Sequence, residues 1–142
     1  SPDVRAIYNE WVLPRKIPTV DGLVDVEPLY NTAQNNGREL LRKRYQELFT
    51  QHNLDALIFP TTAMVAPLAN DDIYKPANFE RLIQNTEPSA SAGIPSIQIP
   101  VGLGSSTGLP VGMELDGPKD SDRRLLAIGQ ILENIIGRVP MA

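Results

Sequence analysis

Cysteine is absent from this sequence of 142 residues, and histidine and tryptophan each occur once, as His52 and Trp11. Without thiols, neither a disulfide framework nor a thiolate metal site is possible. A single histidine also excludes a zinc site built from several imidazoles. Gly102, Gly104 and Gly108 do not predict a phosphate loop, because a strand rather than a helix is expected after them. We therefore expect neither a metal nor a cofactor.

Positive charge is also scarce, since 13 Lys and Arg residues face 17 Asp and Glu residues, for a net charge of −4. A chain without a basic stripe has little to neutralise phosphates with, which argues against nucleic-acid binding.

No apolar run approaches the roughly 18 residues that cross a bilayer, and no signal-peptide pattern opens the chain. The length fits one domain. We expect a soluble, cytoplasmic protein that binds neither nucleic acid nor membrane.

Two apolar segments with few charges, 96–102 and 110–116, are separated by a turn rich in Gly, Ser and Thr. Short continuous apolar runs of this kind predict strands that are buried on both faces, in the middle of a sheet. The segment 56–59 (ALIF) predicts a third strand. Pro100 lacks an N–H group, so we expect a bulge at that position.

The remaining periodic segments predict helices over 2–13 and about 27–51, with an irregular loop over 15–26 between them. A short helix follows an N-cap at Asn85 or Thr86 and ends at Gly93, and a last helix runs from a cap at Asp120 or Ser121 to Gly137. Ser1 is expected to cap the first helix. The expected buried stripe of the second helix is Tyr30, Ala33, Gly37, Leu41, Tyr45 and Leu48.

The fold class predicted from these elements is α/β, with helices that cover part of a mixed β-sheet. Pro60-Thr61-Thr62 directly follows the predicted strand 56–59. Ligands of open α/β sheets bind at the carboxyl ends of strands, so the two hydroxyls could face a pocket. Threonine after a strand is equally common as a simple turn residue, and both interpretations stay open.

The segment 85–133, NTEPSASAGIPSIQIPVGLGSSTGLPVGMELDGPKDSDRRLLAIGQILE, resembles the carboxyl-terminal segment of the amidase signature family. The preceding LDALIFPTT, residues 54–62, is similar to that family's hydrophobic strand followed by Pro-Thr. Within the family, the sequence of this segment most resembles the members that hydrolyse small aromatic amides. The resemblance implies that residues 1–142 are the carboxyl-terminal portion of an amidase-signature fold. Because the chain starts at Ser1 rather than Met, we also expect a piece of a longer protein.

The family's catalytic residues are a nucleophilic Ser, a second Ser and a Lys, and none of them maps onto this chain. Ser105 and Ser106 imitate part of the Gly/Ser-rich signature, but they lie in the turn between two strands and no Lys stands in the right relation to them. A serine nucleophile needs an adjacent base, so we assign no catalytic residue here and expect the chain alone to be inactive. The resemblance implies that an amino-terminal catalytic portion of the same protein supplies Ser–Ser–Lys hydrolysis of a small amide.

What this portion would contribute is part of the wall of the substrate pocket. The candidates follow strand or helix ends and are Thr61, Thr62, Asn85, Thr86, Ala92, Gly93 and Ile94. The competing interpretation is that all seven merely pack and cap. A second hypothesis for the whole chain is a stand-alone, non-catalytic α/β module for binding or assembly. Because three short strands leave pairing edges exposed, we also expect self-association of the isolated chain.

Overall fold

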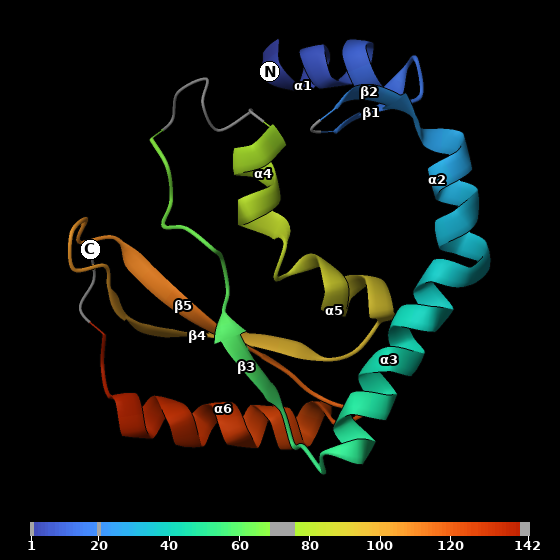
Figure 1. Cartoon of the computed structure of the whole chain (residues 1–142). Helices are drawn as coiled ribbons and strands as arrows, with labels where there is room; N and C mark the ends of the chain where they lie inside the picture. The colour runs from blue at the N-terminus through green and yellow to red at the C-terminus, as the bar shows by residue number, and fades with distance from the viewer. Residues whose placement is uncertain (1, 20, 69–75, 140–142) are drawn as a thin grey trace.

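A three-stranded antiparallel sheet covered by helices forms the body of the molecule (Figure 1). The computed structural model describes residues 2–19, 21–68 and 76–139. The strands are β3 (Leu57–Pro60), β4 (Ser96–Leu103) and β5 (Pro110–Asp116), in the spatial order β3-β5-β4. All three strands lie within a residue of their predicted bounds. The predicted α/β fold is confirmed, and both strand pairings of this described sheet are antiparallel, where a mixed sheet was expected.

Strand β5 lies in the centre and sets the register of the sheet. It pairs Glu114 with Phe59 of β3 on one side and with Gln98 of β4 on the other. The β4–β5 register shifts between Pro100 and Gly102, so the predicted irregularity at Pro100 is confirmed. Burial of both faces was wrong for β4, because its residues on one face, including Gln98 and Pro100, are exposed.

Helix α6 (Asp122–Ile136) covers one face of the sheet. Leu125 packs there against Ile99 and Leu115, and all three side chains are buried. A Cβ atom on Gly129 would collide with the end of the Ile97 side chain, so the missing side chain lets the helix approach β4 closely. The helix is preceded by Ser121 and followed by Gly137, as expected. The Ser121 hydroxyl makes no capping hydrogen bond.

Helices α3 (Arg38–Gln51) and α5 (Glu87–Ala92) cover the other face of the sheet. Phe49 of α3, Ala92 of α5 and Ile94 form a buried cluster there. Gly93 ends α5 in the left-handed region at φ 68°, as its predicted C′ position requires. Thr86 is the N-cap, but its hydroxyl donates to the Ile83 carbonyl oxygen at 3.3 Å instead of capping the helix.

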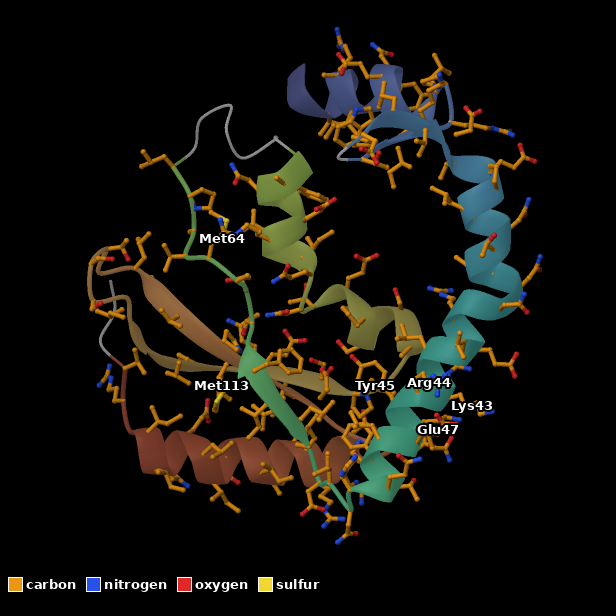
Figure 2. All side chains as sticks on the ribbon, viewed as in Figure 1. Lys43, Arg44, Tyr45, Glu47, Met64 and Met113 are labelled. Carbon is orange, nitrogen blue, oxygen red and sulfur yellow. The ribbon has the colours of Figure 1, made fainter. Side chains whose placement is uncertain are left out.

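The apolar stripe of α3 differs from the predicted one. Leu41, Tyr45 and Phe49 lie on the inner side at four-residue spacing, whereas Tyr30 is 58% exposed and Leu48 is 37% exposed. Figure 2 shows Lys43, Arg44 and Glu47 together on this helix. Arg44 Nη1 donates to Glu47 Oε2 at 3.1 Å on that exposed surface. The buried stripe is shorter along the chain than predicted, because only the part of the helix from Leu41 to Phe49 packs against α5 and the sheet.

The amino-terminal arm, residues 2–37, precedes α3 (Figure 1). A hairpin of β1 (Lys16–Thr19) and β2 (Gly22–Asp25) replaces the predicted loop, and Thr19 pairs with Gly22 next to its turn. None of the described side chains of the arm is buried. The other elements of the arm are α1 (Pro2–Ile7), the π-helical turn η1 (Tyr8–Val12), α2 (Val26–Thr32) and the π-helical turn η2 (Ala33–Gly37).

Helix α4 (Pro76–Ile83) precedes α5 along the chain. The predicted N-cap at Ser1 lies outside the described residues. None of the helices in the described part of the chain is long and apolar enough to cross a membrane.

Candidate functional site

The polar face of β5 opens into a cavity of about 420 Å³ beside α5. Its polar lining comes from β3, α5 and both long strands, and its apolar lining includes Ala90 and Ile94. The cavity is broad and open to the surface of the described chain, and its volume is within the range of small-molecule pockets. The polar residues that line it are Thr61, Thr86, Ser89, Ser96, Gln98 and Glu114.

Strand pairing places Thr61 in this cavity. The Thr61 N–H donates to the Gly112 carbonyl oxygen at 3.1 Å, which extends the β3–β5 pairing by one residue. Thr61 therefore lies two residues after Phe59, the partner of Glu114, and on the same face of the sheet. Its side chain is 7% exposed, and Oγ1 has no hydrogen-bond partner within the described chain.

Gly112 provides the space above the strand. A Cβ atom at this position would lie 2.9 Å from Thr61 Oγ1 and would collide with the Gln98 amide. The absence of a side chain therefore lets two polar groups from neighbouring strands approach each other over β5. We conclude that glycine at position 112 shapes the floor of the cavity.

Glu114 is a nearly buried acid, 4% exposed, at the centre of the polar face. Ser96 Oγ donates to its Oε1 at 2.9 Å. Ser89 Oγ lies 3.4 Å from the same oxygen and 3.3 Å from the Thr86 carbonyl oxygen, and its single proton is shared between these two acceptors. Burial is the main cause that raises the pKa of the Glu114 carboxyl above its usual range, and the Ser96 hydroxyl opposes the shift. The negative form of the Glu114 carboxyl is thus stabilised mainly by the Ser96 hydroxyl, at a cost in desolvation.

A second buried acid, Asp116, follows on the same face. Tyr45 OH donates to Asp116 Oδ2 at 3.2 Å, while Oδ1 has no hydrogen-bond partner in the described residues. Burial raises the pKa of the Asp116 carboxyl, and the hydroxyls of Ser96, Tyr45 and Ser89 counteract that shift. Burial, followed by the charge of Asp116, raises the pKa of Tyr45 to about 12. This pair links α3 to the central strand.

Three of the seven predicted wall residues, Thr61, Thr86 and Ile94, line the same cavity. They come from the end of β3, the start of α5 and the segment after its C-cap. Ile94 also belongs to the buried cluster with Phe49 and Ala92, so it serves packing as well as the cavity wall.

The other four predicted residues make contacts that hold the surrounding backbone, and they are not in the lining of this cavity. Thr62 Oγ1 donates to the Met64 carbonyl oxygen at 2.6 Å, and Asn85 Nδ2 donates to the Pro60 carbonyl oxygen at 2.6 Å. Ala92 is fully buried and its carbonyl oxygen accepts a hydrogen bond from Arg42 Nε at 2.9 Å. Gly93 forms the left-handed C-cap.

The sequence prediction missed Ser89, Ser96, Gln98 and Glu114. The available signal was the alternation in the two strands, where Ser96 and Gln98 occupy one parity and Gly112, Glu114 and Asp116 occupy one parity of the other strand. Buried acids are rare unless they have partners, so Glu114 and Asp116 in an otherwise apolar strand also indicated a polar face.

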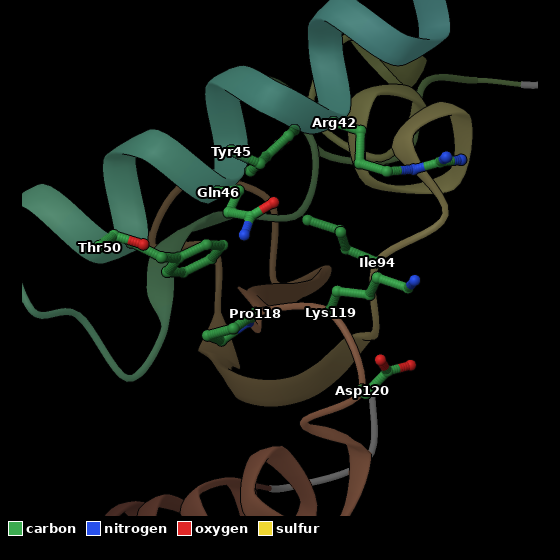
Figure 3. A pocket seen from close by; sticks show the side chains of 9 residues that line it. Arg42, Tyr45, Gln46, Thr50, Ile94, Pro118, Lys119 and Asp120 are labelled. Carbon is green, nitrogen blue, oxygen red and sulfur yellow. The ribbon is translucent and has the colours of Figure 1, made fainter.

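A second cavity, of about 300 Å³, lies between α3 and the turn that precedes α6 (Figure 3). Arg42, Tyr45 and Gln46 line it from the helix, and Lys119 and Asp120 line it from the turn. Ile94 separates the two cavities, since it belongs to the lining of both. The Arg42 guanidinium is already engaged with α5 through Ala92.

The serines of the β4–β5 turn have no catalytic arrangement. Ser105 and Ser106 are exposed in a turn in which the Gly108 N–H donates to the Gly104 carbonyl oxygen at 2.8 Å. Among the described residues, no group of three or more His, Asp and Glu side chains could hold a metal ion. The cavity beside α5 can therefore bind and orient a polar ligand, but its described lining contains no activated nucleophile.

Comparison with protein families gives a match to the family described as Amidase over residues 16–126. The chain is 42% identical over 141 residues to mandelamide hydrolase from Pseudomonas putida. It is 40% identical over 143 residues to indoleacetamide hydrolase from Rhizobium radiobacter. These alignments cover 99% and 96% of this chain, but only 28% and 29% of the relatives. The chain thus spans less than a third of their length.

Solved structures share the fold. The crystal structure of PAM12A matches with a TM-score of 0.61 at 28% identity, over 78% of this chain and 21% of that chain. Fatty acid amide hydrolase matches with a TM-score of 0.60 at 19% identity, over 83% of this chain and 25% of that chain. At that identity the second match supports the fold alone.

Proposed function

This chain belongs to the amidase family, and from that premise we propose that it forms the carboxyl-terminal portion of an amide hydrolase that acts on small aryl amides. The observation that carries the proposal is the identity of 42% to mandelamide hydrolase over 99% of this chain. The similarity to indoleacetamide hydrolase extends the substrate class to amides with a different aromatic ring. We further propose that residues 1–142 work as one part of a longer protein, and a cytoplasmic location remains a prediction.

In this proposal the chemistry is performed by residues outside this chain. A serine of the amino-terminal portion attacks the amide carbonyl, and a second serine and a lysine move its proton. The amide C–N bond breaks with release of ammonia, and water then hydrolyses the acyl-enzyme that remains. Backbone N–H groups stabilise the oxyanion of the tetrahedral intermediate.

This chain contributes one wall of the acyl pocket. Thr61, Thr86 and Ile94 support this role because they line one cavity between β3, α5 and β4. Thr62, Asn85, Ala92 and Gly93 keep their place in the proposal as the residues that hold the backbone of that wall. Asn85 carries part of this task through its hydrogen bond to the Pro60 carbonyl oxygen, which joins the start of α5 to the end of β3.

The experiment is an ammonia-release assay with mandelamide and indoleacetamide. We expect the full-length protein that contains these residues to hydrolyse at least one of them, and the purified chain of 142 residues to hydrolyse neither. A full-length protein that is folded and hydrolyses neither amide would refute the proposed function. Activity of the isolated chain that survives repurification would refute the division of labour between the two portions.

A further inference from the structure

The cavity beside α5 contains two polar atoms that the fold itself does not use. Both hydrogen bonds to the Glu114 carboxylate in the described chain end on Oε1, which leaves Oε2 for another partner. Thr61 Oγ1 is buried and has no hydrogen-bond partner within the same part of the chain. Both residues line the cavity. A buried hydroxyl without a partner is costly, so such a group needs a ligand or another compensating contact.

We propose that this cavity is a polar subsite that binds a hydrogen-bond donor on the acyl part of the substrate, such as a hydroxyl or a ring N–H, through Thr61 and Glu114. This inference rests on the proposed function, because it names the part of an aryl amide that the cavity recognises.

Glu114 is the charged residue in the lining of this cavity, so the cavity favours a ligand that donates a hydrogen bond to it, while the Thr61 hydroxyl and the Gln98 amide can donate or accept. An ionised carboxylate only accepts hydrogen bonds, and a threonine hydroxyl can accept one as well. Ser96 directs its proton to the other carboxylate oxygen, so it reinforces the charged form instead of competing for Oε2. Ser89 has one proton to share between that oxygen and the Thr86 carbonyl oxygen. A ligand hydroxyl or N–H thus meets acceptor oxygens contributed by β5 and by the residue that follows β3.

The arrangement also orients the rest of the ligand. Ala90 and Ile94 provide apolar surface on the helix side of the cavity, while Thr61, Gln98 and Glu114 lie on the strand side. An aromatic ring fits against the first group when its donor faces the second. Gly112 keeps the strand side open, since a side chain there would meet both Thr61 Oγ1 and the Gln98 amide.

The test compares two substrates that differ by one hydroxyl in the full-length enzyme. Mandelamide carries a hydroxyl on the carbon beside the carbonyl, and phenylacetamide lacks it. Thr61→Val removes the hydroxyl of the protein but keeps the shape of the side chain. We expect it to lower kcat/KM for mandelamide by about 10-fold or more and for phenylacetamide by less than about 3-fold, because losing a hydrogen bond to the substrate hydroxyl affects only the substrate that makes it.

Three further variants make the result specific. Thr61→Ser retains a hydroxyl and should keep most of the preference for mandelamide. Glu114→Gln retains the shape of the acid and should reduce the same preference. Thr32→Val is the control, because Thr32 lies in α2 and its hydroxyl donates to the Pro28 carbonyl oxygen. It should leave both activities unchanged.

The subsite would be overturned if Thr61→Val lowered kcat/KM equally for the two substrates and Glu114→Gln also left their ratio unchanged. Amide hydrolysis as the proposed function would stand in that case. A wild-type enzyme that hydrolyses none of mandelamide, phenylacetamide and indoleacetamide would instead overturn the proposed function, and the subsite with it. Circular dichroism and a thermal melt of each variant establish that the comparison is made on folded protein.

Discussion

Replacing Tyr45 by phenylalanine would remove the hydrogen bond that the buried Asp116 carboxylate receives from α3. Asp116 is fully buried, Tyr45 OH donates to Oδ2 at 3.2 Å, and Oδ1 has no partner in the described chain. The new phenyl ring would keep the packing of the tyrosine, whose centroid lies 6.3 Å from that of Phe49. Hydrogen bonds to charged groups contribute about 1.5–3 kcal/mol, so we expect a loss of that size in the free energy of unfolding.

A double-mutant cycle separates the pair from its surroundings. Asp116→Asn removes the charge, and the Tyr45→Phe/Asp116→Asn variant should be more stable than the sum of the two single effects indicates, by about 1–3 kcal/mol. The assay is urea denaturation followed by circular dichroism at about pH 8, with all variants at one protein concentration and in the same oligomeric state by sedimentation. Tyr30→Phe is the matched control, since Tyr30 is 58% exposed and its change should cost less than about 0.5 kcal/mol.

Two outcomes would refute this reasoning. One is a Tyr45→Phe variant as stable as the Tyr30→Phe control. The other is additivity within about 0.5 kcal/mol, which would mean that the two groups do not interact. The pKa of Tyr45 gives an independent check. Because burial is the first cause that raises the pKa of Tyr45 to about 12 and Asp116 is the second, Asp116→Asn should lower this pKa only part of the way toward the ordinary tyrosine value of about 10.

Other expectations concern pH, helix packing and association. The pKa values of Glu114 and Asp116 are raised mainly by burial, so their contribution to stability is full below the unfolded-state pKa values and is lost as the pH rises through the raised ones. Glu114→Gln should therefore flatten the fall in thermal midpoint with rising pH, and an unchanged slope would contradict the shift. Gly129→Leu should destabilise the fold by about 1–3 kcal/mol, because the new side chain would collide with Ile97. Gln130→Leu is the control, since Gln130 is exposed and its replacement should not destabilise the fold. Equal thermal midpoints for the two variants would count against the close approach of α6 to β4. Ile131 and Ile135 are 59% and 74% exposed, so the isolated chain should associate and a double Lys variant should sediment closer to a monomer; a compact wild-type monomer at micromolar concentration would contradict this.

The elements that the sequence predicted well are those whose signals are local. The strands β4 and β5 are continuous apolar segments joined by a turn rich in Gly, Ser and Thr, and Pro100 marks its own irregularity because it has no N–H. Gly93 ends α5 because the left-handed region suits a residue without a side chain. These features depend on the chemistry of one or a few neighbouring residues.

The parts that differed depend on contacts between distant segments. Tyr30 has the right spacing for the stripe of the long helix, but the packing against α5 and the sheet extends only over Leu41, Tyr45 and Phe49. The sequence does not predict the hairpin 16–25, because Pro18 weakens a strand prediction and the residues do not alternate clearly between apolar and polar.

The candidate site was predicted in part for the same reason. Thr61, Thr86 and Ile94 stand at the ends of recognisable elements, so their place beside a cavity could be inferred. Ser96 and Glu114 belong to strands whose apolar content concealed the polar face. The side chains of Ser96 and Glu114 come together because the strand register pairs Gln98 with Glu114. This register cannot be inferred from either strand alone.

The central claim, that the catalytic residues lie outside this chain while the chain forms a wall of the pocket, can be tested by covalent labelling. The full-length protein is treated with a serine-reactive fluorophosphonate, digested and analysed by mass spectrometry. Our account predicts one modified serine in a peptide upstream of these 142 residues, with labelling slowed by mandelamide. A specific adduct on Ser105, Ser106 or another serine of this chain, lost together with activity when that serine is replaced by Ala, would contradict it.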